Sequence, residues 1–562
     1  MKKRKRTLWE WICVSGIIQT STVFILSIIG ETLLYNTMNH TKLSLHNLSD
    51  YKIAYIVTIA FWLIVLGKNA LWLNSSRKIG LMTWLDRYVY DPPDVSGRKY
   101  KAQHPPVDEK YLSDKPDGLV LGKQGKKYVR FPISKGHALS SIILGTPGSG
   151  KSVLLLSLLV YQLNKANPKD ESPKGRDRPT YFIIDVKPEL LKKSTYPSDK
   201  YVKELSVTNR SKYGWDVYYN LGKCVTDDEI LTELDVIARA LIEEPKGSKG
   251  KNEFFYESAR TIFKFLCLAK YKSGWTFMMT IDYILESDME QVVMDVLAEA
   301  EDNIELLKVK RGLIAYENKE GSEAYSGIEL AFRQSMEVFQ KDSTRYFLES
   351  NPKKLSPLTL EDMITIGFTI KTTQIKEYKT ILRLVVMQLL QHCENRDEDN
   401  SHLITLIIDE AYRLGVINWV DFLSISRSKQ VSCVLAFQSL SQMQSVWSKE
   451  EADSLIEMVS AIAVLSCRSK TTAEMICSWA GDYQEEKISS NVGGKQDLTY
   501  SRTYDTKKVL EPVDLMQIQQ NKEAILFLEG QYYRVDVDKA RYYNIPELNS
   551  ISKKCLEENE KQ

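Results

Sequence analysis

The segment at residues 145–152 constrains this chain most, because it reads G-T-P-G-S-G-K-S. The apolar run 142–144 precedes it, and an apolar helical stretch, 153–163, follows it. Glycines at three of its positions let backbone N–H groups turn inward without Cβ clashes. Such a sequence between a strand and a helix is typical of a phosphate-binding loop in an α/β domain. A glycine-rich turn that binds nothing is the alternative.

The residue types of this loop indicate a nucleoside triphosphate and its metal ion. Lys151 reaches the terminal phosphates, and the Ser152 hydroxyl holds magnesium. The following helix points its positive end at the same phosphates. We therefore expect ATP and Mg²⁺ as cofactors. The predicted ATP-binding residues are Gly145, Thr146, Pro147, Gly148, Ser149, Gly150, Lys151 and Ser152.

A second motif at residues 403–410 is an apolar strand that ends in Asp409 and Glu410. Adjacent side chains of a strand point to opposite sides. We assign Asp409 to the metal and Glu410 as the general base that activates water. An acidic strand end that caps the next helix is the alternative.

The apolar strand 431–437 ends at Gln438. This side chain is placed to sense the γ-phosphate or to position water. An ordinary helix N-terminus explains a polar residue there equally well.

Apolar runs typical of buried parallel strands recur along the chain, with helical patterns between them. They lie at 140–144, 181–185, 403–409 and 432–437. This alternation predicts a parallel sheet flanked by helices. The predicted domains are an ATPase at 119–226 and 350–550, an all-α insertion at 227–349, a proline-rich linker at 80–118 and a disordered tail at 551–562.

The first 79 residues have the pattern of a membrane anchor with two transmembrane helices, at about 11–30 and 51–73. Basic residues cluster before the first and after the second, whereas the loop between them has one lysine and no arginine. The positive-inside rule therefore predicts a multi-pass protein of the cell membrane, with both termini and the ATPase domain cytoplasmic. A signal peptide is the alternative for the first span, but a small-residue cleavage site is lacking.

Composition neither supports nor excludes DNA as a partner. The formal net charge is only +2, so DNA contacts must come from local patches or from a ring of subunits. The eight cysteines are scattered without a C-x-x-C pair, which indicates reduced thiols rather than a metal site.

Five further segments carry a family pattern. They are Y-F-I-I-D-V-K-P-E-L at 181–190, W-D-V-Y-Y-N-L at 215–221, N-E-F-F-Y-E-S-A-R at 252–260, the arginine at 427 with L-A-F-Q-S-L at 435–440, and E-A-I-L-F-L-E-G-Q at 523–531. Together with the two nucleotide motifs they resemble the coupling proteins of conjugation and type IV secretion, within the FtsK/HerA class of DNA translocases. Tyr256 stands where that family commonly has tryptophan, and Gln430 replaces a glycine. The short ATPase body and the lysine- and asparagine-rich composition are most similar to those of the coupling proteins of Gram-positive conjugative plasmids.

The resemblance implies a RecA-like P-loop NTPase fold and a homohexameric ring that hydrolyses ATP to move DNA. It implies single-stranded plasmid DNA with its relaxase as the substrate, and conjugation channel subunits as partners. In such rings an arginine of the neighbouring subunit stabilises the transferred phosphate. Arg427 is the candidate, with Arg468 and Arg502 behind it; an ordinary surface arginine is the alternative.

Three other functions stay open at this point. An ATPase of the same fold exports proteins in some secretion systems, although those motors usually carry several ATPase modules. A membrane scaffold that recruits channel subunits without hydrolysis is another, but intact Lys151, Asp409 and Glu410 argue against it. A chromosome-segregating pump usually has four spans and a carboxy-terminal winged helix, for which the chain after residue 543 has no room.

Overall fold

A computed structural model describes residues 102–133, 136, 138–164, 179–207, 211–244, 253–301, 303–316, 323–398, 402–492 and 498–561, with five isolated positions before them. The chain divides into two compact units. The larger comprises His104–Gly481 and Leu510–Gln562, and the other comprises Met1–Gln103 and Asp482–Val509. In this second unit, β13 (Asp482–Val492) and β14 (Leu498–Lys508) pair as a long antiparallel hairpin.

The two predicted membrane spans lie outside the described residues, apart from positions 25, 56, 59, 60 and 63. In the part of the chain that the structure describes, no helix combines the length and the apolar character needed to cross a bilayer. The membrane anchor and its orientation therefore stay predictions.

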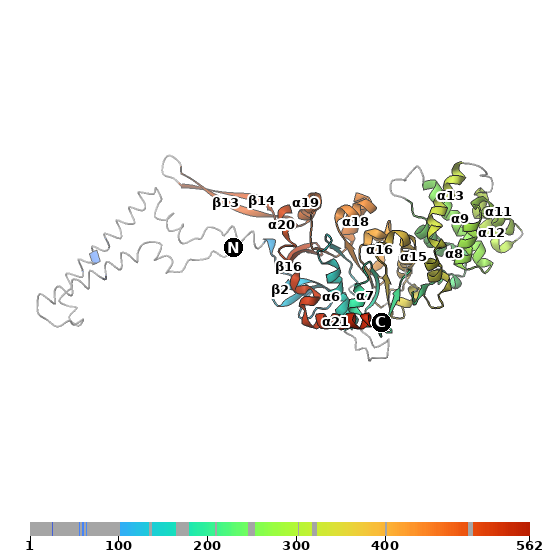
Figure 1. Ribbon diagram of the computed structural model, residues 1–562. Helices are drawn as coiled ribbons and strands as arrows, with labels where there is room; N and C mark the ends of the chain where they lie inside the picture. Colours follow the sequence, from blue (N-terminus) through green and yellow to red (C-terminus); the bar gives the residue numbers. More distant parts are fainter. Residues whose placement is uncertain are drawn as a thin grey trace. The chain divides into compact units, whose positions relative to one another are not determined.

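A mixed sheet runs through the larger unit, with helices packed around it (Figure 1). It has twelve strands in the order β1-β3-β2-β16-β15-β12-β4-β11-β10-β5-β9-β6. The strands from β12 to β6 pair in parallel, and those from β15 to β1 pair antiparallel. The predicted parallel sheet is thus confirmed at the centre, and the segment 523–531, which resembles the closing strand hairpin of the family, lies in the antiparallel pair of β15 and β16. The antiparallel strands β1, β2 and β3 were not predicted. The strands are β1 (Leu112–Ser113), β2 (Leu119–Gln124), β3 (Lys127–Phe131), β4 (Ser141–Leu144), β5 (Thr180–Asp185), β6 (Val202–Leu205), β9 (Thr365–Thr369), β10 (Ile404–Ile408), β11 (Val431–Phe437), β12 (Ala461–Val464), β15 (Glu523–Leu528) and β16 (Gln531–Asp536).

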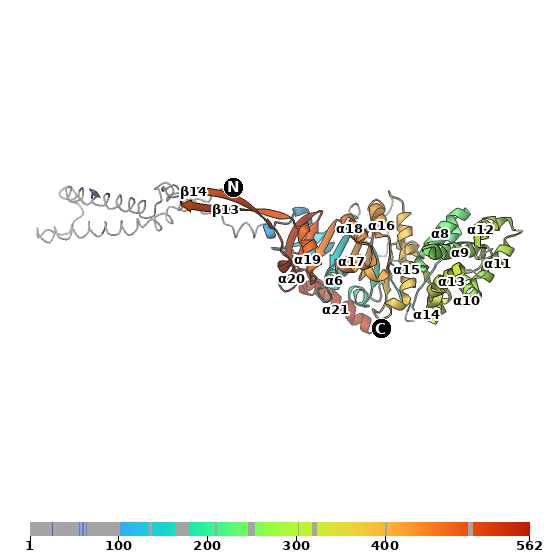
Figure 2. The ribbon, with the colours of Figure 1, turned by 90° about the horizontal axis from the view of Figure 1, so that it is seen from above.

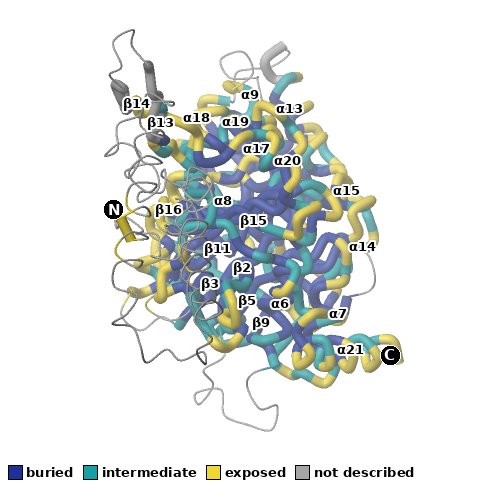
Figure 3. Tube along the Cα trace, turned by 90° about the vertical axis from the view of Figure 1, so that its left-hand side faces the viewer, coloured by how far each residue is buried: buried dark blue, intermediate teal, exposed yellow. Residues whose placement is uncertain are grey.

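Both faces of the parallel strands are covered, and the strands lie in the buried interior (Figure 3). On one face, Ile143, Ile183 and Ile407 join a core cluster with α6 (Lys151–Asn164). Ile184 and Leu406, their neighbours along the strands, are equally buried but lie outside that cluster. Because side chains alternate along a strand, this pattern explains why the strands read as continuous apolar runs.

Two groups of helices flank the sheet. The first contains α6, α7 (Leu190–Ser194) and α21 (Pro546–Glu560), which pack against one another. In the second, α15 (Ile375–Glu394) packs on α16 (Trp419–Ser426), and α16 packs on α18 (Lys449–Met458).

An all-helical segment is inserted between β7 (Gly214–Trp215) and β8 (Lys354–Leu355), with no strand among its described residues (Figure 2). The two short strands pair in parallel, Gly214 with Lys354, so the chain leaves and re-enters at one place. The main helices are α8 (Asp227–Leu241), α9 (Glu253–Lys272), α10 (Phe277–Glu286), α11 (Met289–Glu299), α12 (Leu307–Leu313), α13 (Glu323–Met336) and α14 (Asp342–Arg345).

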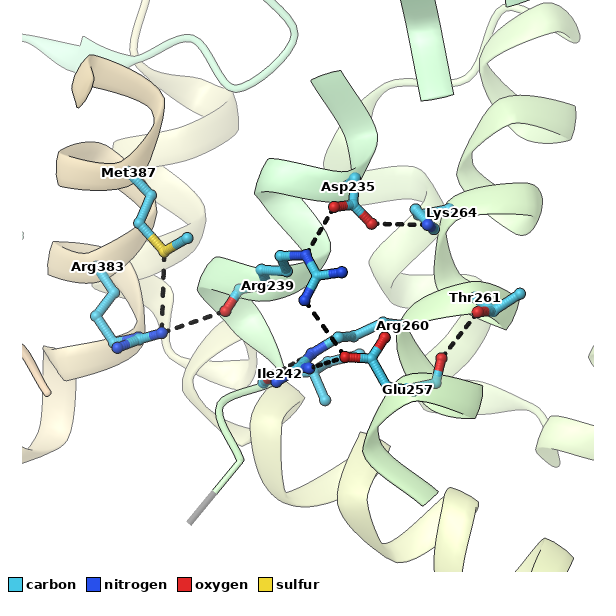
Figure 4. A network of polar contacts seen from close by, with 9 residues as sticks. All are labelled: Asp235, Arg239, Ile242, Glu257, Arg260, Thr261, Lys264, Arg383 and Met387. Atoms are coloured by element: carbon cyan, nitrogen blue, oxygen red, sulfur yellow. Dashed lines mark hydrogen bonds and ion pairs between the residues drawn. The ribbon is translucent and has the colours of Figure 1, made fainter. Parts of the chain in front are cut away.

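Arg383 of α15 connects this helical insertion to the segment that follows β10. Figure 4 shows its contact with α8, where it donates to the Arg239 carbonyl at 3.2 Å. Its buried guanidinium donates to the Ala240 carbonyl at 3.3 Å and to the Glu243 carboxylate at 3.1 Å, at the end of α8. It also donates to the carbonyls of Leu414 and Val416, at 3.2 and 2.7 Å, in the segment after β10. One arginine therefore satisfies carbonyls that a helix end and a loop would otherwise leave unpaired.

The predicted linker at 80–118 is wrong in its last part. Glu109–Tyr111 form a 3₁₀ helix, and β1 then pairs with β3. Tyr111 is buried against Tyr533, with ring centroids 6.5 Å apart. A two-residue edge strand has no periodicity to read, and the prolines around it indicate only an extended chain.

The predicted disordered tail at 551–562 is also wrong. Helix α21 continues to Glu560. Leu548 and Cys555 are buried, and Ile551 packs against the main core cluster. These residues recur at helical spacing, so a single apolar stripe holds the helix on α6 and α7 despite its charged composition.

Candidate functional site

The phosphate-binding loop follows β4, at the carboxyl edge of the parallel strands. Gly145 donates its backbone N–H to the Phe437 carbonyl of β11 at 3.1 Å. Because β10, β11 and β4 are adjacent and parallel, their following residues meet at this edge. The loop, Asp409 and Gln438 are thereby gathered in one place from distant parts of the chain.

The three glycines of the loop are required by its geometry. Gly148 and Gly150 have φ of 80° and 102°, a region that residues with a Cβ rarely adopt. A Cβ on Gly145 would lie 2.3 Å from Ser149 Oγ. Ser149 Oγ is itself buried without a hydrogen-bond partner among the described residues, so the loop contains a polar group that a ligand can satisfy.

The exposed tip of the loop is Pro147 with Gly148, and its base is held by Ser466. Thr146 donates its backbone N–H to Ser466 Oγ at 2.8 Å, and the two hydroxyls are also 2.8 Å apart. Ser466 follows β12, the strand on the other side of β4. The loop is thus positioned from both neighbouring strands.

Lys151 lies inside this loop and is 8% exposed. Its ammonium donates to the carbonyls of Gly145 and Thr146, the latter at 3.5 Å. Burial lowers its pKa, although the charges of Asp409 and Glu410 oppose that change. No carboxylate of the described residues forms an ion pair with Lys151, so the fold buries a cation without an anionic partner.

Ser152 and Asp409 form the second part of the site. Ser152 Oγ donates to Asp409 Oδ2 at 3.3 Å. Burial, followed by the charge of Glu410, raises the pKa of Asp409 to about 6, against the effect of Lys151. A hydroxyl and a buried carboxylate are the oxygen ligands that Mg²⁺ takes in nucleotide sites, so these residues fit that ion.

Glu410 occupies a strained position, with φ of 57° and ψ of 51°. Its carboxylate accepts hydrogen bonds from Arg413 and from Gln438 Nε2, the latter at 3.3 Å. The Gln438 side chain is oriented in turn by Gln442, whose Nε2 donates to Gln438 Oε1 at 3.0 Å. The predicted base and the predicted polar sensor are therefore in direct contact.

The three candidate arginines lie in different places. Arg427 is exposed at the end of α16, before β11, and so lies at the amino edge of the sheet, away from its own phosphate loop. Arg468 is exposed after β12, at the carboxyl edge. Arg502 belongs to β14 of the second unit. None of the hydrogen bonds described for the loop involves them.

Sequence reasoning missed Ser466, Arg413 and Gln519. Gln519 donates its side-chain amide to the Gly148 carbonyl at 3.3 Å. Ser466 follows a strand of only four residues and Gln519 sits in an ordinary polar stretch, so only the folded chain brings these two residues to the loop. Arg413 lies three residues after Glu410 in the segment A-Y-R-L-G, and it pairs with the Glu410 carboxylate rather than with the loop.

The chain matches the family described as Type IV secretory system conjugative DNA transfer over residues 182–562, more than half of its length. Its fold is similar to the bacterial conjugative coupling protein TrwBdeltaN70 in its unbound monoclinic form, at 15% identity and a TM-score of 0.58, covering 78% of this chain and 90% of that chain. None of the curated proteins compared with the chain matches it.

Two further solved structures with the same fold are complexes of TrwB. The complex with the non-hydrolysable ATP analogue ADPNP has 15% identity and a TM-score of 0.57, covering 76% of this chain and 90% of that chain. The complex with ADP and Mg²⁺ has 16% identity and a TM-score of 0.54, covering 77% and 90%. This chain therefore belongs to the type IV secretory system conjugative DNA transfer family and is a conjugative coupling protein.

Proposed function

We propose that this coupling protein is a membrane-anchored ATPase that moves plasmid DNA into a conjugation channel. One observation carries the proposal: the fold gathers Lys151, Ser152, Asp409 and Glu410 at one sheet edge, where the lysine and both carboxylates are buried and the lysine has no ion-pair partner among the described residues. The family match supports DNA transfer, and the nucleotide complexes of TrwB support ATP as the ligand.

The residues of the edge fit ATP and Mg²⁺. Lys151 and the backbone N–H groups of the glycine-rich loop bind the phosphates, and the Ser149 hydroxyl gains a partner. Ser152 and Asp409 hold Mg²⁺, which when bound neutralises charge on the phosphates. Binding thus resolves the two electrostatic costs of this edge, a buried lysine and a pair of adjacent carboxylates.

Glu410 is the general base in this proposal. Its carboxylate takes a proton from the attacking water, and Gln438, which already donates to it, orients the same water. The Glu410 carboxylate is also bound by Arg413. Because each carboxylate oxygen has two lone pairs, Glu410 can accept a hydrogen bond from water while it keeps its contacts with Arg413 and Gln438.

We further propose a homohexameric ring in which Arg427 acts on the neighbouring subunit. Arg427 lies at the amino edge of its own sheet, so only a site on another subunit is within its reach. In a head-to-tail ring the amino edge of one subunit faces the nucleotide of the next. The predicted spans at 11–30 and 51–73 would anchor this ring to the cell membrane, with the ATPase domain in the cytoplasm.

The decisive test is ATP hydrolysis by the purified full-length protein in detergent, with and without single- and double-stranded DNA across a salt series. DNA-stimulated hydrolysis that salt suppresses is expected, because basic side chains bind the phosphate backbone. Hydrolysis that is indifferent to DNA would contradict DNA translocation, and absence of hydrolysis would contradict the motor itself.

The matching test in cells uses Lys151→Ala and Glu410→Gln. Both variants should abolish plasmid transfer while membrane insertion stays normal, because one removes phosphate binding and the other removes water activation. Normal transfer by either variant would overturn the proposal.

A further inference from the structure

A second cation, Arg541, lies against the phosphate-binding loop. A Cβ placed on Gly150 would lie 3.5, 3.7 and 3.8 Å from Nη2, Cζ and Nε of its guanidinium. The guanidinium therefore covers the loop at Gly150, which is the residue before Lys151. Arg541 comes from the far end of the chain, just after η10 (Asp538–Ala540).

The backbone of Arg541 is fixed by its neighbours. Ser157 of α6 donates its hydroxyl to the Ala540 carbonyl at 3.2 Å. Asn544 donates its N–H to the Arg541 carbonyl at 2.9 Å. The phosphate-binding loop leads directly into α6. The loop and the backbone next to Arg541 are therefore held by the same helix.

The side chain is aimed by two contacts and retains free donors. Nη1 donates to the Tyr543 hydroxyl at 2.7 Å and lies 3.6 Å from Asp538 Oδ1. Neither Nη2 nor Nε has a hydrogen-bond partner within the part of the chain that the structure describes. The Arg541 side chain is 23% exposed, so a ligand at the loop can reach it.

We propose that Arg541 is a nucleotide-binding residue that contacts the phosphate chain, and that Tyr543 is the positioning residue that orients it. A planar guanidinium presents paired donors that match phosphate oxygens, so it complements the point charge of Lys151. This inference rests on the proposed ATPase function, and it makes the carboxy-terminal segment part of the nucleotide site.

The test is the affinity of the full-length protein for nucleotide, measured by displacement of a fluorescent ATP analogue in the presence of Mg²⁺. Arg541→Ala should weaken ATP binding about tenfold or more, the value of one or two charge-assisted hydrogen bonds. Tyr543→Phe should weaken it by a smaller factor, because the guanidinium loses its orienting partner. Lys539→Ala is the matched control, since that exposed lysine pairs with Asp536 instead and should leave affinity unchanged.

Inorganic tripolyphosphate separates phosphate contact from other contacts. Arg541→Ala should weaken tripolyphosphate binding by the same factor as ATP binding. If only ATP binding weakens, Arg541 contacts the base or ribose and the proposal is wrong.

Wild-type affinity for ATP in an Arg541→Ala variant that melts at the wild-type temperature would also overturn the proposal. If Arg541→Ala does not fold, Arg541→Lys, which keeps the charge but loses the paired donors, must show an intermediate affinity. Failure of the wild-type protein to bind the analogue would instead contradict the proposed function.

Discussion

The two edges of the same parallel sheet hold buried charge in opposite ways. At the carboxyl edge, burial and the neighbouring Glu410 raise the pKa of Asp409 to about 6. At the amino edge, burial acts in the same direction on Glu361, but His392 and Arg396 overcome it and lower its pKa to about 2.

At the amino edge the charged side chains have hydrogen-bond partners within the fold. Arg396 donates to Glu361 at 2.8 Å and to the carbonyls of His402 and Lys429, each at 2.7 Å, and so ties together the segments before β10 and β11. The carboxyl edge has a buried lysine that lacks an anion and a glutamate with a left-handed backbone. Charge that the fold leaves unsatisfied is a sign of a binding site, whereas satisfied charge is a sign of architecture.

Lys151→Ala should produce the largest effect, and only on activity. ATP hydrolysis should fall at least about 100-fold, because the variant loses a preorganised cation at the phosphates. The melting temperature without nucleotide should stay equal or rise, since a buried and unpaired charge is removed. Lys192→Ala, an exposed lysine on α7, is the control that should leave both quantities unchanged. A melting temperature well below that of wild type would show that the carboxyl edge also needs its charge for stability.

Arg396→Ala should show the reverse pattern. Removing one partner of this buried cluster should cost about 3 kcal/mol in the free energy of unfolding, measured in urea. Hydrolysis per folded molecule should stay close to wild type. The neighbouring pair of Lys429 and the exposed Glu398, 3.5 Å apart, gives the control: Lys429→Ala should cost less than about 0.5 kcal/mol. Equal losses in the two variants would refute the distinction between the edges.

The pH dependence of stability should depend on Glu361. Its pKa in the folded protein, about 2, lies below the ordinary value of 4.5. The ionised carboxylate therefore stabilises the fold above pH 4.5, and this contribution is lost as the pH falls toward 2. Unfolding of Glu361→Gln should be less dependent on pH across that window than unfolding of the wild type. Parallel curves for the two proteins would contradict the assignment.

Two buried serines offer the finest comparison. Ser432, at the start of β11, shares a 2.9 Å hydrogen bond with Thr405, so Ser432→Ala should cost about 1 kcal/mol in unfolding free energy. Ser149 has no partner in the described chain, and Ser149→Ala should change that free energy by less than about 0.5 kcal/mol. A larger loss for Ser149 than for Ser432 would show that the loop hydroxyl has a structural role.

The core of the candidate site could be predicted because its residues are contiguous. The phosphate loop is one eight-residue segment, and Asp409 with Glu410 ends one apolar strand. The central strands β4, β5, β10 and β11 could also be predicted, since burial on both faces makes each of them a continuous apolar run in the sequence. Local sequence carries this information without reference to the rest of the chain.

The remainder depends on contacts between distant segments. Ser466 meets Thr146 across 320 residues, and Arg396 meets Glu361 across 35 residues from different elements. Neither contact leaves a local pattern. The antiparallel strands β1, β2 and β3 were missed because they are short or mixed in polarity, and α21 was missed because its composition is charged.

The pairing of β7 with β8 has a consequence for how such a protein can diverge. Because the inserted helices begin and end at one small ladder, their length and sequence can change without displacing any strand of the sheet. The insertion is therefore exchangeable, and its replacement by the corresponding segment of a relative should leave the sheet folded. Such a graft needs to retain the carbonyls of Arg239 and Ala240 and the carboxylate of Glu243, the three groups of the insertion to which Arg383 donates.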